Sequence, residues 1–206
     1  MLFRSGWEGR EIPDALNGVR MVIGGKLARL LYVSPNQINA QVPADTSAGT
    51  QALAVNNGTA ASLGLNVTVG AVAPAIFFTP AGGIVVKNAD FSLVGPDNPA
   101  QAGDVLVIYS TGLGQTTPAL TTGVLVPLTP LSNTVPVTVT IGGQNAEIIG
   151  SVASPGFAGL YQTAVRMPPG VAAGNRPVIL RAGGVDRKST RLNSSHIQKS
   201  RMPSSA

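Results

Sequence analysis

Residues 137–143 of this 206-residue chain, Val137-Thr138-Val139-Thr140-Ile141-Gly142-Gly143, decide the fold class. Apolar and hydroxyl side chains alternate over the first five positions, so a β-strand would place three aliphatic side chains on one face. The two glycines that follow suit the left-handed backbone of a tight hairpin turn. The stretch therefore predicts an amphipathic strand that leads into a hairpin.

The same signals occur along most of the chain. Leu65–Val69 repeats the alternation, and the continuously apolar Val105–Tyr109 is typical of a central strand, although a short buried helix would show the same pattern. Ile84–Val94 is free of Gly and Pro but shows no helical spacing of apolar residues. Short strands separated by Gly- and Pro-rich turns predict an all-β fold built from antiparallel β-sandwiches.

The hairpin signal belongs to an internal repeat. Thr140–Gly143 matches Val22–Gly25 at an offset of 118 residues, and Gln162–Pro168 matches Gln37–Pro43 at an offset of 125. The seven extra residues of the second copy fall around Ser154–Phe157, where we expect a loop. Self-similarity of this kind indicates two structural units of the same type.

The repeat divides the chain into two modules, residues 6–72 and 102–185. A Pro-rich connecting segment, residues 73–101, separates them, and we expect a hairpin in it around Asn88-Ala89-Asp90. The second module follows Val105–Tyr109 into its hairpin, whereas the first has no equivalent strand. The first module closes with Leu63–Val69, which the second lacks. We therefore expect one open sheet edge in each module and a tendency to associate.

The basic charge of the chain is concentrated at its C-terminal end. Residues 186–206 hold five basic residues and one acidic residue, whereas the rest of the chain holds nine basic and eight acidic residues. The modules are therefore nearly neutral, and they lack the basic surface that nucleic-acid binding requires. No apolar run is long enough to span a membrane, so no membrane insertion is expected. The absence of cysteine excludes disulfides and thiolate chemistry.

Both ends of the chain differ in character from the modules. Residues 186–196 can be encoded by GATCGGAAGAGC followed by ACACGTCTGAACTCCAGTCAC, and Leu2–Ser5 by CTCTTCCGATCT. These strings share one DNA sequence read on opposite strands, and it resembles a sequencing adapter. We therefore interpret residues 1–5 and 186–206 as adapter translation and expect the latter segment to be disordered; a natural basic tail is the alternative.

The modules resemble a C-terminal domain family of exported proteins from Solibacter-type acidobacteria, whose halves are similar to IPT/TIG immunoglobulin-like domains. The resemblance extends from about Pro13 to Val185. It implies two tandem immunoglobulin-like β-sandwiches, truncated at both ends. The stretches that carry it are Leu31–Pro43, Ala73–Phe77, Ala102–Gly114, Val137–Gly143 and Ser154–Gln162.

The resemblance also implies a function and a location. It predicts a non-catalytic structural or adhesive module of a larger exported bacterial protein, placed outside the cell or on its surface. The expected partners are other domains of the parent protein or surface proteins. The family carries no established catalytic residues, so we expect no enzyme, no cofactor and no catalytic site.

Nucleophilic catalysis finds little support in the residues themselves. It needs a nucleophile, a base and an orienting group held together. The only histidine, His196, lies in the C-terminal segment, and neither Ser110 nor Ser154 has an evident base. Lys26 and Lys87 belong to no recognisable motif. The sequence therefore favours a protein without catalysis.

Two kinds of ligand remain open. Oxygen-bearing side chains in or beside the connecting segment, namely Asp90, Asp97, Asn98 and Asp104, could bind calcium, although their spacing fits no known calcium loop. No metal site is assigned on this basis. Carbohydrate binding would need exposed aromatic rings, and we expect the best exposed rings near the seven-residue insertion. The alternative function is thus a carbohydrate-binding module, with possible glycan contacts at Phe157 and Tyr161.

Overall fold

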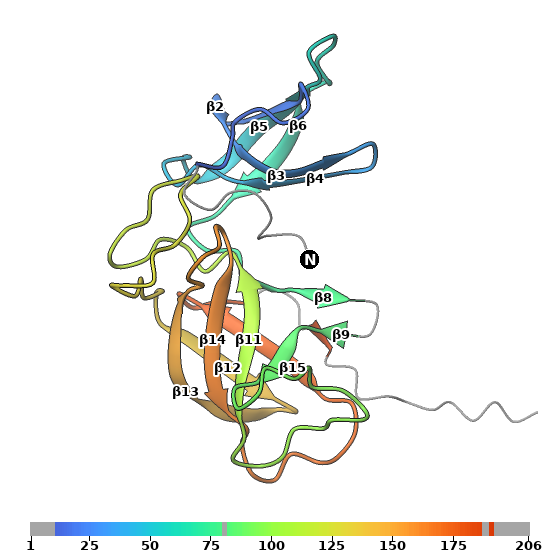
Figure 1. Ribbon diagram of the computed structural model, residues 1–206, viewed down its shortest axis with the longest axis vertical. Helices are drawn as coiled ribbons and strands as arrows, with labels where there is room; N and C mark the ends of the chain where they lie inside the picture. The colour runs from blue at the N-terminus through green and yellow to red at the C-terminus, as the bar shows by residue number, and fades with distance from the viewer. Residues whose placement is uncertain (1–10, 80–81, 187–189, 192–206) are drawn as a thin grey trace, which may run out of the picture.

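The computed structural model describes residues 11–79, 82–186 and 190–191, and it consists of two β-lobes stacked along the long axis (Figure 1). Lobe 1, residues 11–72, holds β1–β6, and lobe 2, residues 73–191, holds β7–β17. All pairings between strands are antiparallel, and no helix occurs among the described residues. The all-β fold predicted from the sequence is confirmed.

Lobe 1 has two layers. A four-stranded sheet has the order β2-β1-β5-β6, and the hairpin β3–β4 forms the second layer. Residues of both layers enclose a small core around Met21, Ile23, Ala28 and Leu30. The strands are β1 (Arg20–Ile23), β2 (Lys26–Leu27), β3 (Arg29–Ser34), β4 (Gln37–Gln41), β5 (Gly49–Asn56) and β6 (Leu65–Val69).

Lobe 2 is larger and has a more extensive core. Its strands follow the order β10-β11-β14-β13-β12-β15-β16, with β7 on β11 and β17 on β15, and β8 and β9 form a separate hairpin. Their bounds are β7 (Ala75–Ile76), β8 (Phe78–Thr79), β9 (Gly82–Gly83), β10 (Val85–Lys87), β11 (Val105–Thr111), β12 (Val137–Ile141), β13 (Gln144–Ala153), β14 (Tyr161–Arg166), β15 (Pro177–Ala182), β16 (Val185–Asp186) and β17 (Thr190–Arg191).

The long strand β13 joins the two layers of lobe 2. Its first part, Gln144–Ala146, pairs with β12, and its second part, Glu147–Ala153, pairs with β14. The register shifts between Ile148 and Gly150, as at a β-bulge, which bends a strand. The path of strands thereby folds over the core, whose buried members are Ile76, Val85, Leu106, Ile108, Leu113, Val139, Ile141, Val165, Val178, Leu180 and Ala182.

The internal repeat is present in the strand registers. β1 pairs with β5 as β12 pairs with β15: Ile23 lies opposite Leu53, and Ile141 lies opposite Val178. The register of the hairpin β3–β4 shifts between Leu30 and Tyr32. Adding 118 to these residue numbers gives Ile148 and Gly150, between which the register of β13 shifts. Both offsets found in the sequence therefore relate equivalent positions of the two lobes.

The segment expected to connect the modules contributes strands to lobe 2. β7 and β10 both pair with β11, and Ile76 and Val85 belong to the core. A hairpin follows β10, in which the Lys87 N–H donates to the Ser92 carbonyl oxygen at 2.9 Å. Residues 73–101 are thus only partly a connection, because their first half completes one layer of lobe 2.

The C-terminal end of the described chain pairs with β15. Val178 lies opposite Thr190 of β17, as Leu53 lies opposite Leu65 in lobe 1, so the offset of 125 holds here too. The segment expected to be disordered thus contains two residues that occupy the position of a closing strand. Residues 1–5, 187–189 and 192–206, which fall within the adapter prediction, lie outside the described residues.

Candidate functional site

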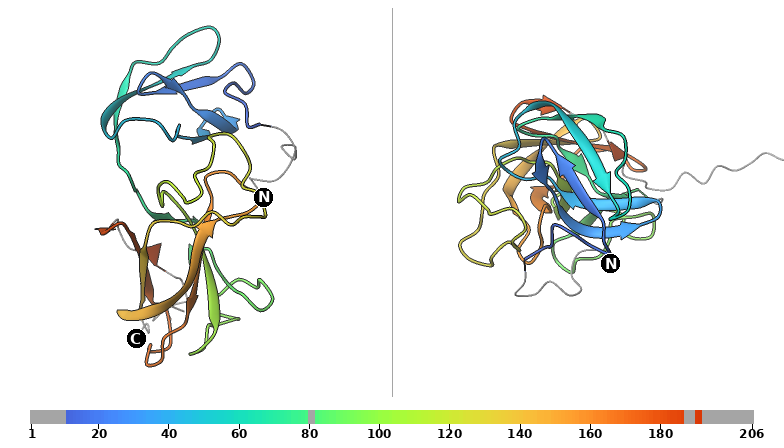
Figure 2. Two further views of the ribbon diagram at one scale, coloured as in Figure 1. Left: turned by 90° about the vertical axis from the view of Figure 1, so that its left-hand side faces the viewer. Right: turned by 90° about the horizontal axis from the view of Figure 1, so that it is seen from above.

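A long loop between β11 and β12 of lobe 2, residues 112–136, reaches toward lobe 1 and contacts it (Figure 2). Its residue Gly123 accepts a hydrogen bond from the Ile12 N–H at 2.7 Å, and its own N–H donates to Gln41 Oε1 at 2.8 Å. The Ala44 N–H donates to Thr122 Oγ1 at 2.9 Å. Backbone groups of both lobes therefore take part in the contact, which fixes its geometry more closely than side chains alone would.

Gly123 lies directly against lobe 1 in this contact. It is buried and has φ of 86°, a backbone conformation that favours glycine. A Cβ atom at this position would lie 2.8 Å from Arg29 Nε. The same arginine donates through Nη1 to the Ile12 carbonyl oxygen at 3.2 Å. The contact thus depends both on the missing side chain of Gly123 and on the placement of Arg29.

Tyr161, one of the two aromatic residues expected to be exposed, supports this loop. It begins β14, its ring packs against the core of lobe 2, and its hydroxyl donates to the Gly114 carbonyl oxygen at 2.6 Å. Burial raises the pKa of the Tyr161 hydroxyl, because the charged phenolate is poorly solvated there. The ring is only partly accessible, and its polar end has a partner within the protein.

Phe157, the other predicted residue, is also partly buried. Its carbonyl oxygen accepts from the Val126 N–H at 2.9 Å, and the Gly156 N–H donates to the Val126 carbonyl oxygen at 2.8 Å. The seven-residue insertion therefore lies against the 112–136 loop. Phe157 and Tyr161 therefore both contact the 112–136 loop, and neither presents a fully exposed ring.

Among the described residues, the most exposed aromatic residues lie elsewhere in lobe 2. Phe78 is 74% exposed and Phe91 is 66% exposed. A pocket of about 60 Å³ lies beside the β8–β9 hairpin and is lined by Thr79, Gly82, Gly83, Leu93, Val94, Gly95 and Pro96. Consecutive side chains of an extended segment, such as those of Phe77 and Phe78, point to opposite sides, and this signal could have indicated the exposed ring of Phe78.

Two acidic residues in or beside the connecting segment, Asp90 and Asp104, serve local turns. Asp90 Oδ1 accepts from the Ser92 N–H at 2.9 Å and from the Ser92 hydroxyl at 2.6 Å, and these hydrogen bonds lower the pKa of Asp90. Asp104 Oδ2 accepts from the Gln101 N–H at 2.9 Å and lies 3.7 Å from Lys87 Nζ. The contact between Asp90 and Ser92 is typical of an Asx turn, whereas Asp104 accepts from the N–H of a residue three positions earlier.

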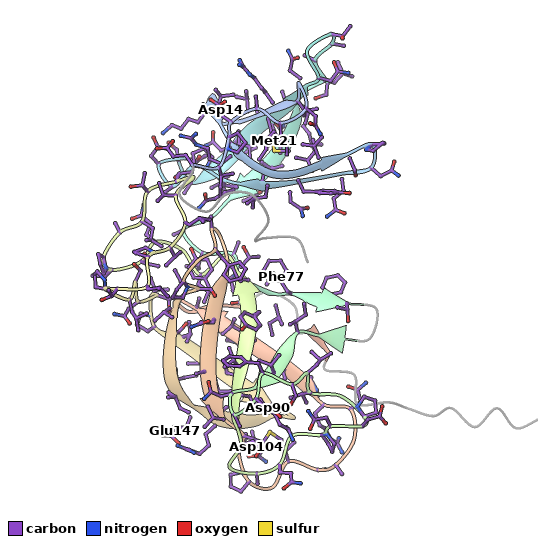
Figure 3. All side chains as sticks on the ribbon, in the orientation of Figure 1. Asp14, Met21, Phe77, Asp90, Asp104 and Glu147 are labelled. Atoms are coloured by element: carbon purple, nitrogen blue, oxygen red, sulfur yellow. The ribbon has the colours of Figure 1, made fainter. Side chains whose placement is uncertain are left out.

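Figure 3 shows Asp90 and Asp104 at the end of lobe 2 that points away from lobe 1. An open groove of about 320 Å³ lies near them, lined by Lys87, Asn88, Ala89, Gly103, Asp104 and Val105. Within residues 11–79, 82–186 and 190–191, no three His, Cys, Asp or Glu side chains gather closely enough to hold a metal ion. The groove offers one carboxylate, which faces a lysine.

The two serines considered as nucleophiles lie in different surroundings. Ser110 is fully buried, and its hydroxyl has no hydrogen-bond partner among the described residues. Ser154 donates to Gln162 Oε1 at 3.3 Å. An amide oxygen is not a general base, so this contact does not activate the serine.

The chain was compared with known protein families, curated proteins and solved structures. No protein-family model, no curated protein and no solved structure matched the chain. The part of the chain that the structure describes also contains no helix that is long and apolar enough to cross a membrane.

Proposed function

We propose that this chain is a non-catalytic structural or adhesive module of a larger exported bacterial protein, in which two immunoglobulin-like lobes form a spacer of fixed geometry. The partners would be other domains of the parent protein or proteins of the cell surface. Export and the surface location rest on the family resemblance described above.

The contact at Gly123 is the observation that supports a spacer most directly. Lobes joined only by a connecting segment move relative to each other by default. Here the 112–136 loop adds one backbone–backbone hydrogen bond, to Ile12, and two hydrogen bonds between a backbone N–H and a side-chain oxygen, at Gln41 and Ala44, far from the covalent connection. Such a second attachment restrains the angle between the lobes, as a spacer requires.

The absence of cysteine makes this restraint easy to measure. Spin labels on Thr50→Cys in β5 and Asn145→Cys in β13 would report the distance between the lobes, because both side chains are exposed. We expect a single narrow distance distribution by pulsed electron spin resonance. A broad distribution, with each lobe folded, would contradict the spacer.

The alternative, glycan recognition at Phe157 and Tyr161, has weaker support from the structure. Ring platforms for sugars need an accessible face, whereas these two rings are partly buried and Tyr161 is hydrogen-bonded to Gly114. A glycan array gives the direct comparison. Binding that is lost in Phe157→Ala would favour the carbohydrate-binding module over the purely structural one.

A further inference from the structure

Two Asn-Gly pairs, Asn17-Gly18 and Asn57-Gly58, lie side by side in lobe 1. A Cβ atom on Gly58 would lie 3.5 Å from the Gly18 carbonyl oxygen, and one on Gly18 would lie 3.7 Å from the Asn57 carbonyl oxygen. All four residues are exposed to solvent. The two pairs therefore share their surroundings and differ in the hydrogen bonds that hold them.

An Asn-Gly pair can react with itself. Once a base has removed its proton, the Gly backbone nitrogen attacks Cγ of the Asn side chain. The N–Cγ bond forms, the Cγ–Nδ2 bond breaks, and ammonia leaves a succinimide ring. Water then opens the ring, at the main-chain carbonyl carbon to give isoaspartate or at Cγ to give aspartate. Gly favours the attack because it has no Cβ atom to shield the nitrogen.

Hydrogen bonds hold both reacting groups of the Asn57-Gly58 pair. The Gly58 N–H, which carries the attacking nitrogen, donates to Asn56 Oδ1 at 2.7 Å. Asn57 Oδ1 accepts from the Thr59 N–H at 3.0 Å and from the Ala60 N–H at 2.8 Å. The attack requires these hydrogen bonds to open first, so the folded structure protects Asn57.

The Asn17-Gly18 pair lacks these restraints. It forms a two-residue hairpin turn, with φ of 51° at Asn17 and 76° at Gly18. Two hydrogen bonds between Leu16 and Val19, of 3.0 and 2.9 Å, close the turn. Within the described part of the chain, neither the Asn17 side chain nor the Gly18 N–H makes a hydrogen bond. Such a turn opens locally at a small cost in free energy, which lets the reacting groups meet.

We propose that Asn17 is a site of spontaneous modification, at which the folded protein converts asparagine to isoaspartate and aspartate while Asn57 stays intact. Both products carry a carboxylate in place of an uncharged amide, and isoaspartate also lengthens the main chain of the turn by a carbon atom. The lengthened turn no longer fits the pairing of Leu16 with Val19, directly before β1. This inference goes beyond the spacer proposed above and does not depend on it.

The test ages the whole chain in mildly alkaline buffer and maps it by proteolytic digestion and mass spectrometry. Electron-transfer fragmentation distinguishes isoaspartate from aspartate. In the folded protein we expect Asn17 to react about tenfold faster than Asn57, because only the Asn57 pair must first break its side-chain hydrogen bonds. In the chain unfolded in urea, the two rates should be similar, since the reacting atoms are the same.

A variant next to the protected pair completes the test. Asn56→Ala removes the oxygen that holds the Gly58 N–H, from a side chain that is itself exposed. It should raise the rate at Asn57 and leave the rate at Asn17 unchanged. Amide hydrogen exchange at Val19, followed by NMR in the parent chain, should rise with the fraction of isoaspartate.

Equal rates at the two pairs of the folded chain, or a faster reaction at Asn57, would overturn the proposal. So would an Asn17 that stays intact over the time in which the unfolded chain reacts at both pairs. An equal rise at both pairs in Asn56→Ala would also overturn it, because local hydrogen bonds would then not be what protects Asn57.

Discussion

The hydroxyl of Tyr161 illustrates how single residues support the 112–136 loop. It donates to the carbonyl oxygen of Gly114 from a ring that packs against the core of lobe 2. Tyr161→Phe keeps the ring but leaves that carbonyl without its partner. We expect a loss of about 1 kcal/mol in the free energy of unfolding, measured by urea denaturation. An unchanged midpoint would show that the hydrogen bond contributes nothing.

The raised pKa of Tyr161 also predicts a dependence on pH. The folded protein holds the phenol proton more tightly than the unfolded chain, in which the pKa is 10.0. The contribution of Tyr161 is therefore fully present below pH 10 and is lost as the pH rises through the folded value. The decline of stability above pH 10 should be shallower in Tyr161→Phe, and equal slopes would contradict the role of burial.

Two equivalent isoleucines allow the stability of the two cores to be compared. Ile23 in β1 and Ile141 in β12 are equivalent in the repeat, and both are buried. Ile141 lies in the larger core, which β11 helps to enclose. Ile141→Ala should cost about 2–5 kcal/mol, and Ile23→Ala should cost less, because its surroundings already lie closer to solvent. Native-state hydrogen exchange would report each lobe separately, and a larger cost for Ile23→Ala would contradict this difference.

Much of the strand arrangement could be predicted from local pattern. The alternation in Val137–Ile141 gave β12, and the two offsets gave equivalent pairings in both lobes. The pairing of β7 and β10 with β11 could not be predicted, because two- and three-residue strands carry no periodicity of their own. The partial burial of Phe157 and Tyr161 also could not be predicted, because the 112–136 loop that contacts them is distant along the chain and has no regular pattern.

At the scale of the whole molecule, Gly123 should control the restraint between the lobes. Gly123→Ala and Gly143→Ala place the same side chain at nearly the same φ, 86° and 85°, so the backbone strain is matched. Only at position 123 would the new Cβ atom meet Arg29. The distance distribution between labels at positions 50 and 145 should therefore broaden in Gly123→Ala and stay narrow in Gly143→Ala. Equal distributions in the two variants would show that the loop does not restrain the lobes.

The attachment at Gly123 also has a consequence for the order in which the molecule matures on the ribosome. The N–H of Ile12 finds its partner more than one hundred residues later in the chain, after the whole of lobe 1 has been synthesised. Domains fold as units, and the N-terminal one folds first during synthesis. We therefore expect lobe 1 to fold on the nascent chain before lobe 2 does. The angle between the lobes is then fixed only after residues 112–136 have left the exit tunnel.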